Sequence, residues 1–185
     1  MTETLFKLES VQKVIGLETI DSTQTAARLL APAQAHGTLI LACQQTAAFD
    51  RENKTFPATE GGVYFTLILK PSKEISLEKL TQAAANAVAE TLKIIFELKI
   101  KTTETGNILA WDKASRKFKK IAGILAETDE NDTYLLGTGI FLNNTLPASY
   151  KNTHITLKTL IRAETSKELF LDDVLNRFWK EYAFL

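Results

Sequence analysis

Residues 119–142 read KKIAGILAETDENDTYLLGTGIFL and contain two apolar runs separated by a polar stretch. The first run is Ile121–Glu127 and the second is Tyr134–Leu142. The six residues between them, Thr128–Thr133, are mostly Asp, Glu, Asn and Thr. Short apolar runs joined by a brief polar segment are typical of a β-hairpin, so this stretch predicts two paired strands.

Small residues and one lysine set this hairpin apart from ordinary core strands. Lys120 opens the first run, Gly123 follows it, and Gly137 and Gly139 lie in the second run. Glycine lets a ligand approach the backbone closely, and lysine can act as a point charge for a carboxylate or a phosphate. The two strands therefore indicate a pocket, although the lysines within 117–119 also fit a solvated basic hairpin.

The segments outside this hairpin alternate between strand-like and helix-like patterns. Further strands are predicted at Val14–Ile20, Gly37–Gln45, Gly62–Lys70 and Leu98–Thr102. Helices are predicted after the capping residues Asp21–Thr23, after Ser76, and near the C-terminal end over residues 171–182. Residues 46–61 and 103–119 are polar and mixed, which predicts irregular segments. The combination predicts an α+β fold with a mixed β-sheet packed with helices, as a single domain over residues 1–185.

Composition excludes several classes of protein. The 22 Lys and Arg balance the 22 Asp and Glu, and a zero net charge argues against a general nucleic-acid binder. A single cysteine, Cys43, allows no intrachain disulfide and favours a reducing compartment. No apolar run is long enough for a membrane span, and residues 1–4 do not open a signal peptide. The predicted location is the cytoplasm.

Two other places carry unusual polar groups. The hydroxyls of Ser22 and Thr23 stand at a predicted helix N-terminus, where free N–H groups can hold an anion or a polar head group. Gln44 and Gln45 end a predicted strand, where amides can recognise a polar ligand group. A plain helix cap and a plain strand end explain these residues as well. The sequence has no nucleophile elbow, no Walker phosphate loop and no zinc-ligand cluster, so no metal site is predicted.

Taken in order, these segments resemble the biotin–protein ligase family. Each segment alone is a weak signal, but six in the right order and at sensible separations are fairly specific. The matching segments are Asp21–Gln24 (DSTQ), His36–Ile40 (HGTLI), Gln44–Thr46 (QQT), Gly61–Pro71 (GGVYFTLILKP), Lys119–Glu127 (KKIAGILAE) and Gly137–Ile140 (GTGI).

The resemblance implies a class II synthetase-like biotin/lipoate ligase catalytic core and a two-step reaction. Biotin and MgATP, as substrates, first give biotinyl-adenylate, and a lysine of an acceptor such as a biotin carboxyl carrier protein then attacks this mixed anhydride. The family implies no tightly bound cofactor. Residues 1–185 are expected to include neither the N-terminal helix-turn-helix of repressor-type members nor the C-terminal SH3-like domain. Nucleic-acid and membrane partners are therefore not expected, and a homodimer stays open.

Family positions carry over residue by residue. Those that bind the biotin ring system or line its pocket are matched by Ser22, Thr23, Gln44, Tyr64, Gly123, Gly137 and Ile140. Three cations are implied as catalytic. Lys120 matches the lysine that faces the carboxylate and the adenylate phosphate. Lys101 matches the lysine of the family's KWPND segment if two residues are inserted, and Arg51 can substitute for a loop arginine if the loop is shifted.

The nucleotide side departs from the family pattern. The family's GRGRxGR loop reads AAFDRENK at residues 47–54, where Asp50 falls at a key arginine and an acid would repel phosphate. Phe141 replaces an asparagine after Gly-x-Gly-Ile. Three hypotheses follow: an active biotin–protein ligase with different ATP contacts, a biotin-binding relative that does not adenylate (a pseudoenzyme), and a lipoate or octanoate ligase-like protein. The glutamines and hydroxyls favour biotin, because a fatty chain needs no polar groups that recognise a ring.

Overall fold

The computed structural model describes residue 8 and residues 10–185, so the prediction about a signal peptide at residues 1–4 lies outside the described residues. Seven strands form one sheet in the order β1-β2-β3-β7-β6-β5-β4. Strands β1 and β2 are parallel, and the other neighbouring pairs are antiparallel. The predicted α+β fold with a mixed sheet is confirmed.

The elements have the following bounds. The strands are β1 (Lys13–Ile20), β2 (Thr38–Gln45), β3 (Val63–Leu69), β4 (Ile100–Thr102), β5 (Asn107–Asp112), β6 (Lys117–Thr128) and β7 (Tyr134–Ile140). The helices are α1 (Thr23–Leu30), α2 (Leu77–Phe96), α3 (Leu157–Ile161) and α4 (Lys167–Tyr182), with 3₁₀ turns η1 (Ala31–Ala33) and η2 (Ala148–Tyr150).

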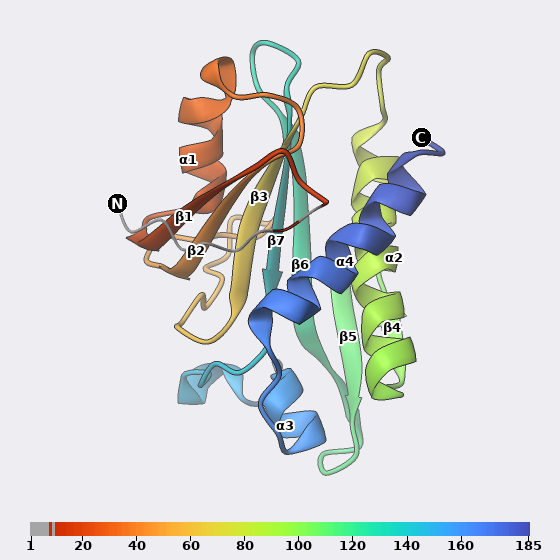
Figure 1. Cartoon of the computed structure of the whole chain (residues 1–185). Helices are drawn as coiled ribbons and strands as arrows, with labels where there is room; N and C mark the ends of the chain where they lie inside the picture. Colours follow the sequence, from red (N-terminus) through yellow and green to blue (C-terminus); the bar gives the residue numbers. More distant parts are fainter. Residues whose placement is uncertain (1–7, 9) are drawn as a thin grey trace.

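One face of the sheet is covered by α2 and α4, which cross in front of it in Figure 1. Ser76 caps α2 by accepting a hydrogen bond from the amide of Lys79, as its position before an apolar period predicts. The small residues of α2 let it approach the sheet closely, and they pack with the apolar face of α4 in the main core. Among the described residues, none of the helices is long and apolar enough to cross a membrane.

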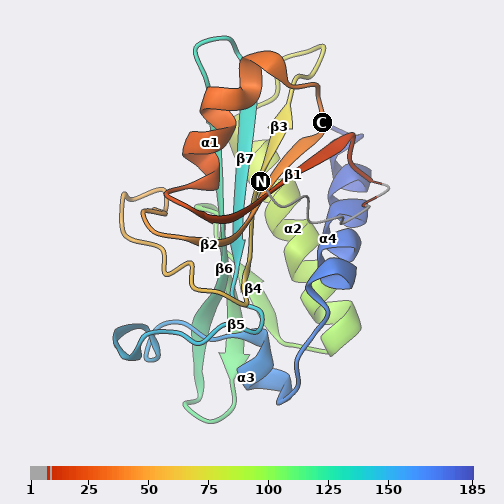
Figure 2. The ribbon, with the colours of Figure 1, turned by 60° about the vertical axis from the view of Figure 1, so that its left-hand side comes forward.

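The opposite face is covered only in part. Helix α1 packs over β2, β3 and β7 and buries a small apolar cluster that includes Ala27, Ile40 and Leu135. The segment between β2 and β3 lies on the same side of the sheet as α1, to the left of the strands in Figure 2. Its side chains Ala48, Phe56 and Ala58 form a third buried cluster. The cavity described below lies between this segment and α1.

The predicted hairpin is confirmed by the pairing of β6 with β7, which runs from Ala122↔Ile140 to Thr128↔Tyr134. Strand β5, however, lies within a segment predicted to be irregular. Its alternation is complete, because Ile108 and Ala110 are fully buried while the residues between them are partly exposed. Polar and charged residues on both sides of this short alternation hide it in the sequence.

Candidate functional site

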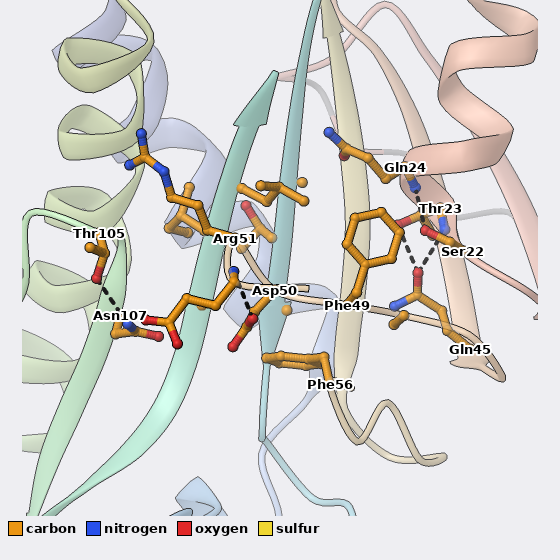
Figure 3. A pocket seen from close by; sticks show the side chains of 18 of the residues that line it. Ser22, Thr23, Gln24, Gln45, Phe49, Asp50, Arg51, Phe56, Thr105 and Asn107 are labelled. Carbon is orange, nitrogen blue, oxygen red and sulfur yellow. Dashed lines mark hydrogen bonds between the residues drawn. The ribbon is translucent and has the colours of Figure 1, made fainter. Parts of the chain in front are cut away.

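A cavity of about 680 Å³, counting the part open to solvent, lies on the α1 face of the sheet. Its walls are the N-terminus of α1, the segment after β2, and the strands β5, β6 and β7 (Figure 3). Of the ten residues in the predicted site, Ser22, Thr23, Arg51, Gly123 and Gly137 line this cavity, and so does Lys120. Segments from three separate parts of the sequence therefore meet in one place.

One end of the cavity is a polar group of side chains around Thr23. Ser22 caps α1 by accepting from the amides of Gln24 and Thr25 at 3.2 and 3.5 Å. Gln45 Oε1 accepts from Thr23 N at 2.6 Å and from Thr23 Oγ1 at 3.0 Å. Both of these hydrogen bonds use the amide oxygen of Gln45, so its Nε2 group can donate to a ligand. Figure 3 shows Gln45 and Thr23 facing each other at this end.

Gln24 forms the back of the polar end. Its Nε2 donates to Glu127 Oε2 at 2.9 Å and to the carbonyl of Leu135 at 3.1 Å. Its Oε1 lies 3.1 Å from Thr66 Oγ1, a fully buried hydroxyl that also lies 3.0 Å from Thr23 Oγ1. Buried polar atoms that are paired in this way hold their orientation. The polar end is therefore a preformed surface.

The glycines of β6 and β7 make room for side chains of the protein itself as well as for the cavity. A Cβ at Gly137 would lie 2.6 Å from Gln24 Oε1, and one at Gly139 would lie 2.6 Å from two atoms of the Phe56 ring. A Cβ at Gly123 would lie 3.2 Å from Lys120 Cε. The bare backbone that the sequence shows at these positions is thus already used by three neighbouring side chains.

An aromatic stack forms the floor at the other end. The rings of Phe56 and Phe141 are stacked with centroids 4.8 Å apart, and Lys120 Nζ lies 5.4 Å from the centroid of Phe56. Phe141 is fully buried. Its ring has no hydrogen-bond donor, so it cannot replace the family's asparagine as a polar contact to a phosphate. A cation over an aromatic ring gains electrostatic attraction from the ring face. The stack therefore supports the ammonium of Lys120 from below.

Lys120 is the buried cation of the cavity. Its side chain is only 12% exposed, and its Nζ lies 3.4 Å from Asp50 Oδ2. Burial lowers the pKa of Lys120 because the charged form loses hydration, and the carboxylate of Asp50 opposes that shift. Next to it, burial and the charge of Lys120 lower the pKa of His154 to about 4. A desolvated ammonium of this kind is strongly attracted to a second anion such as a ligand carboxylate.

A β-bulge turns Lys120 into the cavity. Strand β5 pairs Leu109 with Lys120 but Ile108 with Ala122, so Ile121 is an extra residue on β6. Successive side chains of a regular strand point to opposite faces. Lys120 and Gly123 would then face opposite ways, whereas the bulge brings both onto the cavity face. The consecutive residues Ile121 and Ala122 both enter the core on the other side.

The turn in the segment after β2 is built by Asp50. Its Oδ1 accepts from the amides of Glu52 at 3.0 Å and Lys54 at 3.1 Å, and Phe49 pairs with Thr55 across the turn. Burial acts to raise the pKa of Asp50, but these amides and Lys120 outweigh it, so its pKa lies below the ordinary value. Asp50 is therefore ionised beside Lys120 at neutral pH.

Arg51 follows Asp50 at the rim of the cavity. Its side chain is exposed, and Figure 3 shows it directed differently from the carboxylate of Asp50. The cations that line the cavity among the described residues are Arg51 and Lys120. No group of three or more His, Cys, Asp or Glu side chains within the described part of the chain is arranged to hold a metal ion.

Two predicted biotin-side residues, Gln44 and Ile140, point away from the cavity. Gln44 donates from Nε2 to Thr19 Oγ1 on β1 at 2.9 Å, and its neighbour Gln45 lines the cavity instead. Ile140 is fully buried in the core under α2 and α4, on the opposite face of the sheet from Gly137. For Ile140 the reason is strand alternation, which sends neighbouring positions to opposite faces. Gln44 is held over β1 by its hydrogen bond to Thr19.

Tyr64 and Lys101 also lie outside the cavity lining. Tyr64 is fully buried, donates from its hydroxyl to the carbonyl of Thr59 at 2.7 Å, and contacts Phe56 edge to face. It supports the segment that covers the cavity. Lys101 is exposed on the edge strand β4, where its Nζ lies 4.4 Å from the centroid of Phe118. A position on β4 is two strands away from β6, about 10 Å in the sheet plane.

Several lining residues could not be identified from local patterns. Gln45 had a signal, since it belongs to the pair of glutamines, but the sequence does not determine which of the two faces the cavity. Phe56 had none, because a single aromatic residue in a polar segment has no periodicity. Thr105 lines the cavity from the turn before β5, Asn107 lines it from the first position of β5, and Asn107 Nδ2 donates to Thr105 Oγ1 at 3.0 Å.

Comparison of the sequence with known proteins finds relatives that match most of this chain. No family model matches the chain. The bifunctional ligase/repressor BirA of Bacillus subtilis (strain 168) is 31% identical over 183 residues, which cover 92% of this chain and 54% of that protein. The corresponding protein of Bacillus spizizenii is 30% identical over the same lengths. The chain thus spans about half the length of the curated relatives it matches.

Solved structures give the same picture. The biotin protein ligase of Aquifex aeolicus in complex with biotin and ATP superposes with a TM-score of 0.82 at 25% identity, covering 93% of this chain and 71% of that one. The lipoate complex of LipL1 from P. falciparum superposes with a TM-score of 0.58 at 13% identity, covering 93% and 63%. The second likeness concerns the fold alone.

Proposed function

Because this chain belongs to the biotin–protein ligase catalytic-domain family, we propose that its cavity binds biotin and that the chain activates the biotin carboxylate with MgATP for transfer to a lysine of a carrier protein. The match covers 54% of the length of the Bacillus subtilis relative, so the activity is proposed here for the described cavity and its residues.

The observation that carries the proposal is the polarity of the cavity. Hydroxyls and amides of Ser22, Thr23 and Gln45 form one end, and the buried ammonium of Lys120 forms the other. Biotin has the matching distribution, with a ureido ring at one end and a carboxylate at the other. A ring that carries donors and an acceptor suits the polar end, and a carboxylate in a dry site requires a cation.

The proposed reaction has two steps, adenylate formation and transfer to the acceptor amine. In the first step a carboxylate oxygen of biotin attacks the α-phosphorus of ATP, and pyrophosphate leaves. In the second step the acceptor amine attacks the carboxyl carbon, loses a proton, and AMP leaves. Lys120 would hold the carboxylate and balance negative charge at the phosphorus, while Arg51 at the rim would meet the phosphates.

A calorimetric titration with biotin, with and without MgATP, tests this proposal. The expected result is biotin binding that becomes tighter with MgATP, together with pyrophosphate-dependent exchange of label into ATP. Exchange is the stricter measurement, because only adenylate formation produces it. Absence of both biotin binding and exchange in the folded chain would overturn the proposal.

A second candidate function is biotin binding without adenylation. The ion pair between Asp50 and Lys120 favours this second function, because the carboxylate of Asp50 would repel the phosphates of ATP. The variant Asp50→Arg separates the two functions. If charge alone limits the first step, exchange should rise about tenfold or more in this variant, since one repulsion becomes an attraction. No exchange in either protein, with biotin binding retained, would favour the second function.

The proposed reaction also implies a location, a metal ion and a substrate class. We infer that the reaction takes place in the cytoplasm, that Mg²⁺ enters with ATP as substrate, and that no tightly bound cofactor takes part. Competition by lipoate or octanoate checks the substrate class. A fatty chain cannot satisfy Gln45 and Thr23, so neither acid should displace biotin at comparable concentration.

A further inference from the structure

The cavity-side face of β4, β5 and β6 is open beyond the cavity. Helix α2 packs against these three strands from the other face, and α1 packs over β2, β3 and β7. Figure 2 shows the lower part of β5 and β6 without a helix in front of it. An uncovered sheet face with apolar side chains is a usual place for a partner to bind.

Four side chains make up this open surface, here called the lysine–aromatic patch: Lys99, Lys101, Trp111 and Phe118. The rings of Trp111 and Phe118 meet edge to face with centroids 5.1 Å apart and are half-buried. Lys99 Nζ lies 5.2 Å from the Trp111 ring, and Lys101 Nζ lies 4.4 Å from the Phe118 ring. Each aromatic ring therefore carries an exposed ammonium on its surface.

Both lysines of the patch contact aromatic rings. In the part of the chain that the structure describes, no ion pair involves Lys99 or Lys101. Lys119, by comparison, lies 3.0 Å from Asp112 on the opposite face. The patch thus presents two positive charges that a partner with carboxylates would complement.

The patch adjoins the Lys120 end of the cavity. Trp111 pairs with Phe118 and Leu109 pairs with Lys120 in neighbouring rows of β5 and β6. Phe118 and Lys120 are two residues apart on the same side of the bulge, so they share a face and are separated by about 7 Å along the strand. A protein that brings an amine to a carboxylate held by Lys120 can rest on this patch.

We propose that the lysine–aromatic patch is the docking surface for the carrier protein, and that it recognises carboxylates flanking the acceptor lysine together with an apolar side chain. The proposal rests on the proposed function, because it takes the carrier as the acceptor. Half-buried aromatic residues are frequent anchors of interfaces, and unpaired lysines at the rim steer an acidic partner.

Binding of purified apo biotin carboxyl carrier protein to the full chain tests this surface without requiring catalysis. The titration compares the parent chain with Lys99→Glu and with Lys99→Gln, and Lys101 is left unchanged because the family resemblance implies a catalytic role for it. Charge reversal should raise Kd roughly tenfold, and neutralisation should raise it less. Added salt should weaken the parent complex and have little effect on the charge-reversed one.

Lys93→Glu is the matched control, since Lys93 is an exposed lysine of α2, the helix that covers the other face. Equal Kd values for the parent and the charge-reversed chain, or no binding of the carrier by the parent chain, would overturn the docking proposal. Biotin titration and pyrophosphate exchange are measured on the same samples. Loss of carrier binding with exchange unchanged supports the patch, whereas loss of ATP-dependent exchange in the variants would assign the patch to the nucleotide instead.

Discussion

Asp50 Oδ2 lies 3.4 Å from Lys120 Nζ, across a separation of 70 residues in the sequence. The carboxylate comes from the turn in the segment after β2, and both Asp50 and Lys120 line the cavity. A ligand carboxylate must therefore compete with the protein's own carboxylate for the same ammonium.

Replacing this internal competitor should strengthen binding. Asp50→Asn keeps the acceptor oxygen that holds the turn but removes the charge, so biotin should bind about fivefold more tightly, about 1 kcal/mol for a partly buried pair. Calorimetry measures the change. Glu60→Gln, an exposed residue of the same segment, is the control and should leave Kd unchanged. Weaker biotin binding in Asp50→Asn would show that Asp50 assists the ligand.

Removal of the ammonium should have the opposite effect. Lys120→Ala leaves a ligand carboxylate and Asp50 together without a cation, and biotin affinity should fall tenfold or more, given a cost of about 1–3 kcal/mol for an unpaired buried group. Lys117→Ala removes an exposed lysine of the same strand and should bind as the parent does. Retention of full affinity by Lys120→Ala would remove Lys120 from the site.

The glycines of the two central strands should differ in their tolerance of a methyl group. A Cβ at Gly139 meets the Phe56 ring at 2.6 Å, whereas a Cβ at Gly123 meets the flexible end of Lys120 at 3.2 Å. Gly139→Ala should lower the free energy of unfolding by about 1–3 kcal/mol, as overpacking usually does. It should also speed proteolysis within residues 46–60. Gly123→Ala should be milder in chemical denaturation, and the reverse order would contradict the packing described.

His154 should make stability depend on pH. Burial, and then the charge of Lys120, lower the pKa of His154 from 6.5 to about 4, and Asp50 acts the other way. The unfolded chain therefore binds a proton before the folded chain does, and the free energy of unfolding should fall as the pH drops from about 6.5 to about 4. His154→Gln should reduce this slope in urea titrations at several pH values. An unchanged slope would mean that His154 is not responsible.

Local patterns in the sequence were sufficient for the elements that depend on neighbouring residues. The hairpin of β6 and β7, the cap of α1 at Ser22 and the long amphipathic period of α2 follow from spacing, because helices and hairpins are built from contacts close in sequence. The sequence also showed Lys120 and Gly123 as a lysine and a small residue beside each other. It could not show that both face the same way.

Tertiary structure decided which side chains meet. The direction of a strand residue depends on register and on bulges, so the extra residue Ile121 turned Lys120 into the cavity, while alternation placed Ile140 on the other face. Gln44 is held over β1 by a hydrogen bond to Thr19. The contact between Asp50 and Lys120 depends on how a segment without periodicity folds over the sheet, which no local pattern encodes. The sequence by itself thus determined the elements and the chemical groups available, and only the packing of distant segments decided which of those groups share one cavity.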